Sequence, residues 1–295
     1  MSQSTLNPNP RYLTKSRFKL ALECPTKLYY TQKKDYLDKK LDDEFLQALA
    51  KGGYQVGELA KCYFPGGINI EELDYDTALS KTNELLELEN VIIYEAAFIH
   101  GNLFIRADIV VKDGNNLSLY EVKAKSFHPD EDKFTTRNGI SSSWKPYIYD
   151  VAFQKYVISQ AFPTFKVRAF LMLADKSRTA SVDALNQRFL IKKDERGRIK
   201  IETRGDVSLE SLGEKLLYAA DVDDIIDSIY QDQVFADNPE KSFIEWIHFY
   251  AEKYSKDERI QADLVGACRD CEFKTTDEEE VNGFKSGFKE CWNTV

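Results

Sequence analysis

The sequence predicts an α/β fold, with a central mixed β-sheet, flanking helices and a helical lobe that carries a cysteine cluster. Three strand-like runs follow one another at 91–99, 102–112 and 116–124, and short turn sequences separate them. Helical patterns precede and follow this block. Four of the five cysteines lie toward the two ends of the chain: Cys24, Cys268, Cys271 and Cys291.

The N-terminal part predicts helices. Thr14 or Ser16 can cap a first helix, which Pro25 breaks or bends. Residues 43–67 predict two helical pieces around Gly52–Gly53. The further elements expected, in chain order, are a helix at 75–89, a long helix at 144–162, a strand at 165–174, a hairpin at 188–203 that turns at Arg196–Gly197, and helices at 212–231 and 243–254.

Composition is that of a folded, soluble protein. The 295 residues are 43% hydrophobic, which supports a packed core, and no run is long enough to span a membrane. The polar N-terminus lacks the apolar stretch of a secretion signal, so we expect a cytoplasmic protein. The net charge of −9 argues weakly against nucleic-acid binding, because a basic face can exist elsewhere and metal-dependent nucleases need carboxylates.

Charges of opposite sign occupy the third strand in "SLYEVKAKS", residues 118–126. Glu121 and Lys123 share one face because side chains alternate along a strand. A turn at Gly114–Asn115 would place Asp108 directly opposite Glu121, and a turn at Asp113–Gly114 would offset the two diagonally. Either register brings the two carboxylates within roughly 5–8 Å of each other.

Two carboxylates this close repel unless a cation lies between them. A divalent metal such as Mg²⁺ suits the pair, because it takes one or two carboxylates plus water and phosphate oxygens. Lys123 can then hold or polarise the attacking water, or stabilise charge on a phosphate. The alternative interpretation is an ordinary cross-strand salt bridge on a solvated face.

These residues resemble the PD-(D/E)XK nuclease superfamily, and more narrowly the RecB-like branch that includes the CRISPR-associated iron–sulfur exonucleases. In that pattern an aspartate, here Asp108, precedes an acidic-x-lysine motif, here Glu121-Val122-Lys123, and a helix with a glutamine follows, here Gln154. The resemblance spans nearly the whole chain. It implies a restriction-endonuclease-like sheet and a single nuclease domain over 1–295. Its expected parts are an N-terminal helical part at 12–90, a nuclease core at 91–205 and a helical, cysteine-bearing part at 206–295.

The cysteines fit the same resemblance, because the iron–sulfur branch has one cysteine before the core and three after it. Cys-x2-Cys places two thiolates on one turn, and four separated thiolates can hold Zn²⁺ or a [4Fe–4S] cluster. Spacing does not choose between them, whereas the resemblance favours the cluster, with zinc as the alternative. The expected ligands are Cys24, Cys268, Cys271 and Cys291, and Cys62 is expected to be a buried apolar residue.

The chain departs from the family pattern in two places. A metal-binding histidine is usual after a glycine in an early helix, whereas "GYQVGELA" offers no histidine and only Glu58 as a substitute ligand. The glutamine motif usually has a tyrosine four residues later, and here Gln154 is followed by Tyr156 and pairs better with Asp150. Three interpretations of Glu95 stay open: a further metal ligand, a DNA contact and an ordinary surface residue.

The resemblance therefore implies a Mg²⁺- or Mn²⁺-dependent DNA exonuclease acting on single strands or ends. Asp108, Glu121 and the Val122 carbonyl would bind metal, with Glu58 as a substitute for the missing histidine. Lys123 would orient the water, and Gln154 would align the lysine or the substrate. We assign Glu95 and Tyr156 to substrate binding, within a wider set of basic and aromatic residues that suits single-stranded nucleic acid: Lys125, Lys145, Tyr147 and Tyr149.

A catalytically silent nucleic-acid-binding or scaffold protein that keeps the fold and the cluster is the rival interpretation. The missing histidine and the acidic charge favour it, and the intact Asp108, Glu121 and Lys123 oppose it. A protein partner in a DNA-repair or defence complex is compatible with both interpretations. No membrane partner is expected.

Overall fold

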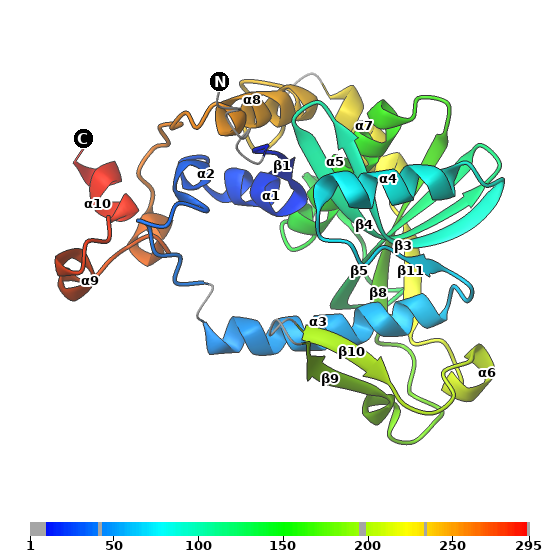
Figure 1. The fold of residues 1–295 in the computed structure, drawn as a ribbon. Helices are drawn as coiled ribbons and strands as arrows, with labels where there is room; N and C mark the ends of the chain where they lie inside the picture. Colours follow the sequence, from blue (N-terminus) through cyan, green and yellow to red (C-terminus); the bar gives the residue numbers. More distant parts are fainter. Residues whose placement is uncertain (1–9, 41–42, 195–198, 233–234, 294–295) are drawn as a thin grey trace, which may run out of the picture. The chain divides into compact units, whose positions relative to one another are not determined.

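The computed structural model describes residues 10–40, 43–194, 199–232 and 235–293 (Figure 1). The contacts within the chain group into two compact units. The first comprises 1–47, 101–104 and 233–295, and the second comprises 48–100 and 105–232. This division cuts across the three parts expected from the sequence, because both chain ends belong to the first unit.

A mixed β-sheet forms the centre of the second unit, with strand order β11-β8-β5-β4-β3-β2. The strands are β2 (Ile68–Asn69), β3 (Asn90–His100), β4 (Leu103–Asp113), β5 (Asn116–Phe127), β8 (Lys166–Asp175) and β11 (Leu217–Asp221). Strand β5 pairs antiparallel with β4 and parallel with β8. The predicted α/β class with a mixed sheet is therefore confirmed, as are the strands predicted at 91–124.

Helices and a hairpin cover the two faces of this sheet. Helices α4 (Tyr75–Leu86) and α5 (Lys145–Ala161) pack on one face, and α5 forms the crossover that parallel strands β5 and β8 require (Figure 1). The other face carries α3 (Glu44–Cys62), whose Leu59 and Ala60 pack with Ile109 of β4 and Met172 of β8.

Smaller elements complete the second unit. They are β6 (Thr135–Thr136), β7 (Gly139–Ile140), η1 (Leu185–Arg188), β9 (Phe189–Lys193), β10 (Ile199–Thr203), α6 (Leu209–Leu212) and α7 (Asp223–Gln231). The predicted hairpin is confirmed as the antiparallel pair β9–β10, and its expected turn at Arg196–Gly197 lies outside the described residues. Gln55 of α3 donates a hydrogen bond of 2.6 Å to the Phe189 carbonyl and so ties this hairpin to the helix.

Two predicted elements differ from the structure. Helix α3 is continuous through Gly52–Gly53, because Val56, Leu59 and Ala60 form an apolar stripe that packs on the sheet. Burying that stripe outweighs a cost of about 1 kcal/mol for each interior glycine. Residues 217–221 form strand β11 and not helix, because β8 offers them a free edge for antiparallel pairing.

The first unit is mostly helical. Its elements are β1 (Leu13–Thr14), α1 (Lys15–Glu23), α2 (Lys27–Tyr30), α8 (Phe243–Ser255), η2 (Gly266–Asp270), α9 (Asp277–Val281) and α10 (Gly287–Trp292). Thr14 caps α1 as predicted, by accepting the Arg17 N–H, and Ser242 forms a capping box with Glu245 on α8. A search of the described helices finds none with the length and apolar character that crossing a membrane requires.

Glu95, inside β3, has a left-handed backbone with φ 56°. This conformation costs a side-chain-bearing residue about 1–2 kcal/mol, whereas glycine adopts it freely. We therefore expect Glu95→Gly to be more stable than Glu95→Ala by about 1 kcal/mol, although both variants lose the same carboxylate. Urea unfolding of the two variants measures the difference. The opposite order, which an ordinary strand position would give, would contradict the left-handed conformation.

Candidate metal centre and cysteine cluster

A tight hairpin brings the two predicted metal ligands to one face of the sheet. Asp113 pairs with Asn116, so the turn consists of Gly114 and Asn115, the first of the two registers considered. The pairing runs back to Ile109 and Tyr120, and one further step leads to Asp108 and Glu121. Both residues alternate away from the face that α3 covers, which carries Ile109.

Asp108 is fixed to the backbone of the neighbouring strand. Its Oδ2 accepts a hydrogen bond of 2.8 Å from the Val122 N–H, in the middle of the Glu-x-Lys motif. The Asp108 carboxylate thus accepts a backbone N–H of β5 just beyond the last residue pair of β4 and β5. This contact holds one carboxylate directly beside the segment that carries Glu121 and Lys123.

Glu121 is fully buried, with 0% of its surface exposed. A buried carboxylate is tolerated only when charged or hydrogen-bonding partners compensate it. Lys123 contacts one of its oxygens and also lies 3.0 Å from Asp150 Oδ2. The ammonium group therefore bridges a carboxylate on β5 and one on α5.

Gln154, also fully buried, completes the group from α5. Its Nε2 donates to Glu121 Oε2 at 2.8 Å and to Asp150 Oδ1 at 3.1 Å, which confirms the predicted pairing with Asp150. The two carboxylate acceptors determine which end of the amide faces them. Gln154 Oε1 is left buried without a hydrogen-bond partner, a state that costs about 1–3 kcal/mol and indicates a place for a donor such as water.

Asp150 is the residue that the sequence reasoning left without a site role. The signal for it was present as Asp-x3-Gln, which places both side chains on one face of a helix. Its importance depends on Lys123 reaching it from another element, and a helical pattern alone does not show that.

Three other predicted site residues lie apart from this group. Glu58 is on α3, which packs against the opposite face of the sheet, and its carboxylate lies 3.3 Å from Lys61 Nζ. Glu95 faces Arg106, with 3.8 Å between Oε2 and Nε. Tyr156 is buried beside the rings of His100 and Tyr230, and burial raises its pKa.

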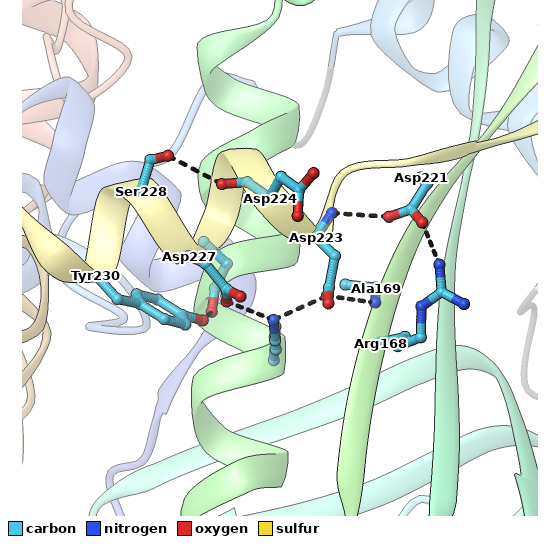
Figure 2. Close-up of polar contacts among 10 residues, drawn as sticks. Arg168, Ala169, Asp221, Asp223, Asp224, Asp227, Ser228 and Tyr230 are labelled. Carbon is cyan, nitrogen blue, oxygen red and sulfur yellow. Dashed lines mark hydrogen bonds and ion pairs between the residues drawn. The ribbon is translucent and has the colours of Figure 1, made fainter.

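The position of α5 is set by a second ion cluster, next to Gln154 along the helix. The buried Lys155 ammonium lies 2.8 Å from Asp223 Oδ1 and 2.7 Å from Asp227 Oδ1. Figure 2 shows both aspartates on α7, with Asp223 also accepting the Ala169 N–H of β8 at 3.0 Å. Two neighbouring residues therefore hold helix α5: Gln154 bonds to Glu121 of β5, and Lys155 forms ion pairs with α7.

The donors of the candidate centre fit a hydrated divalent cation. No three His, Cys, Asp or Glu side chains within the described ranges form a group that could hold a metal ion. Mg²⁺ needs only one or two protein carboxylates, because water and phosphate oxygens supply the rest. Asp108, Glu121 and the Val122 carbonyl can provide these ligands, and the unpartnered Gln154 oxygen suits a water bound nearby.

All four predicted cluster cysteines belong to the first unit. Cys271 and Cys291 pack against one aromatic cluster, which consists of Tyr30, Tyr36 and Phe273. The Cys271 N–H donates to the Cys268 carbonyl at 3.2 Å, so these two residues share a turn. Burial raises the pKa of the Cys271 thiol.

The segments around these cysteines are joined by specific contacts. The buried Thr26 hydroxyl donates to the Ile260 carbonyl at 2.8 Å and accepts the Ala262 N–H at 3.1 Å. Arg259 Nη2 lies 3.4 Å from Cys291 Sγ, as a cation that can stabilise a thiolate. No three of these thiols form a group that could hold a metal ion in the described part of the chain, and Cys62 lies apart from them on α3, in the second unit.

Glu272, next to Cys271, gives the first unit a measurable pH dependence. It is 4% exposed, and Lys27 and Lys40 lie 2.7 Å and 3.1 Å from its carboxylate oxygens. Burial raises its pKa, but the two ammonium groups outweigh burial and bring the pKa below 4.5. A lowered pKa stabilises the fold above the ordinary value, and this stabilisation disappears as the pH falls through the lowered one.

We therefore expect Glu272→Gln to destabilise the first unit by about 2 kcal/mol at pH 7. The difference from the wild type should shrink as the pH falls through the lowered pKa of Glu272, where the wild-type carboxylate becomes protonated. Thermal unfolding at pH 7 and at acid pH measures both values. A difference that stays constant with pH would mean that the carboxylate charge contributes nothing.

A scan against protein-family models finds no match to this chain, and a search of curated proteins finds none either. Its function must therefore be inferred from its own residues and their geometry.

Proposed function

We propose that this protein is a Mg²⁺- or Mn²⁺-dependent deoxyribonuclease that degrades DNA from single-stranded ends and carries a structural [4Fe–4S] cluster. The observation that supports it is the convergence of Asp108, Glu121, Lys123, Asp150 and Gln154 from two adjacent strands and one helix. A solvated surface salt bridge, the plainer interpretation, does not bury a glutamate completely or add a buried glutamine.

Each residue has a role in phosphodiester hydrolysis. Asp108, Glu121 and the Val122 carbonyl would hold the divalent ion, which neutralises charge on the phosphate and lowers the pKa of a water. Lys123 orients the attacking water or stabilises the negative charge that develops on the phosphate oxygens. Asp150 and Gln154 position Lys123 and Glu121, and water then replaces the leaving nucleotide oxygen at phosphorus.

The cysteine cluster has a structural role in this proposal. Cys24 lies in the N-terminal part of the first unit, and Cys268, Cys271 and Cys291 lie in its C-terminal part. A cluster bound by all four would cross-link two segments that are more than 200 residues apart in the chain, which stabilises their association by mass action and chain entropy.

Cleavage of end-labelled single-stranded DNA tests the proposal, with protein purified without oxygen. Degradation is expected with Mg²⁺ or Mn²⁺ and should stop with EDTA, and comparing 5′- and 3′-labelled DNA gives the polarity. Bound but intact DNA under every metal condition would favour the second candidate, a nucleic-acid-binding or scaffold protein. The ion pairs that hold Lys123 to Glu121 and Asp150 are the observation that favours that candidate.

A further inference from the structure

A second lysine lies close to the candidate centre, at a break in strand pairing. Lys123 pairs with Leu173 of β8, and the next pair joins Ser126 to Ala174. Ala124 and Lys125 are therefore extra residues on β5, which makes this a β-bulge. Bulges re-aim the side chains that they carry and are frequent beside active sites.

Aromatic rings hold the Lys125 ammonium. Its Nζ lies 4.7 Å from the ring centroid of Trp144 and 5.3 Å from that of Tyr147. The Trp144 ring is itself fixed, because it is 6% exposed and packs edge-on against Phe127 and Phe134. Such cation–π contacts position a charge and contribute about 0.5–2 kcal/mol, but they do not neutralise it.

Lys125 differs in this respect from Lys123 and Lys155. Lys123 and Lys155 each contact two carboxylates. No ion pair joins Lys125 to a carboxylate anywhere in the part of the chain that the structure describes. In a protein of net charge −9, a cation placed on rings without an acidic partner is suited to an external anion.

Lys123 and Lys125 both contact one stripe of helix α5. Tyr147, Asp150 and Gln154 follow one stripe of this helix, at i, i+3 and i+7. Lys125 lies over Tyr147 and Lys123 contacts Asp150, so the two lysines meet the helix about 4.5 Å apart along its axis. One nucleic-acid strand that reaches Lys123 can therefore contact Lys125 with the next part of its backbone.

We propose that Lys125, held over Trp144 and Tyr147, binds the DNA phosphate next to the one that is cleaved. The inference rests on the proposed nuclease function for the identity of the ligand. Lys125 takes no part in bond breaking. It anchors the backbone one nucleotide away, so it acts on substrate affinity and leaves the chemical step to Lys123 and the carboxylates.

Salt-dependent binding of fluorescent single-stranded DNA in EDTA tests this contact without requiring cleavage. Lys125→Met keeps the length of the side chain and removes its charge. We expect the slope of log affinity against log salt to fall by about 0.7, the value for one lost phosphate contact, and affinity to fall about tenfold. Lys125→Arg, which keeps the charge and the ring contact, should restore both.

Lys166→Met is the matched control. Lys166 is an exposed lysine that pairs with Asn116 of β5, at the end of the strand far from Lys123 and about 23 Å along β8 from Leu173. Its loss should leave the salt slope unchanged. A neutral methylphosphonate at the linkage next to the cleaved one should weaken binding of the wild type and have no further effect on Lys125→Met.

Cleavage kinetics separate this inference from the proposed function. Lys125→Met should raise KM about tenfold and leave kcat within about twofold. Cleavage with unchanged slope and KM in Lys125→Met would overturn the phosphate contact and leave the nuclease in place. A reduced slope without cleavage by any variant would support the contact and overturn the nuclease. Failure of the wild type to bind single-stranded DNA would overturn the contact.

Discussion

Replacing Lys123 by alanine is expected to reduce metal-dependent cleavage of single-stranded DNA by at least about 100-fold, the largest effect we predict on activity. The ammonium contacts the Glu121 carboxylate and is held at a defined place by Asp150, 3.0 Å away. Initial rates on end-labelled DNA, with saturating Mg²⁺ or Mn²⁺, measure the loss. Lys166→Ala, at the far end of the sheet, should keep wild-type activity.

Stability must be followed in the same experiment, because Lys123→Ala leaves the fully buried Glu121 without its cation. Removing one partner of a buried pair typically costs about 3–5 kcal/mol. Asp108→Asn avoids this difficulty, since an asparagine oxygen can still accept the Val122 N–H while the charge is lost. Both variants should be inactive. Wild-type rates in both, with folded protein, would place hydrolysis at another site or in a contaminant.

Replacing Cys24 by alanine is expected to have the largest effect on stability. The variant should lose its iron and its visible absorption, and the first unit should lose at least about 3 kcal/mol of unfolding free energy. The physical reason is that ligand binding and folding are coupled when ligands come from distant segments. Iron and zinc analysis of anaerobically purified protein, together with thermal unfolding, measures both effects.

Cys62→Ala is the matched control for this experiment. Cys62 is half-buried on α3 in the second unit, its thiol donates to the Glu58 carbonyl at 3.3 Å, and burial raises the pKa of the thiol to about 11. Its loss should leave the metal content unchanged. Equal iron in Cys24→Ala and the wild type would remove Cys24 from the ligand set. Zinc in place of iron in the wild type would select the alternative metal.

Local patterns predicted most of the fold. The strands at 91–124 follow from alternating apolar residues and a two-residue turn, and α5 follows from its length and composition. The two errors have a common origin. Gly52–Gly53 lowers the local helix propensity, but the packing of α3 on the sheet keeps this segment helical. Residues 217–221 are too short an apolar run to be assigned from the sequence, and the free edge of β8 makes them a strand.

By itself, the sequence determined that Asp108, Glu121 and Lys123 share one face of a hairpin, because alternation and a tight turn are local rules. Only the tertiary structure brought Asp150 and Gln154 to Lys123 and Glu121, and the rings of Trp144 and Tyr147 to Lys125. These contacts depend on how α5 docks on the sheet. Docking is set by buried surfaces and by the Lys155 ion cluster, which join residues far apart in the chain, and no local pattern encodes their alignment.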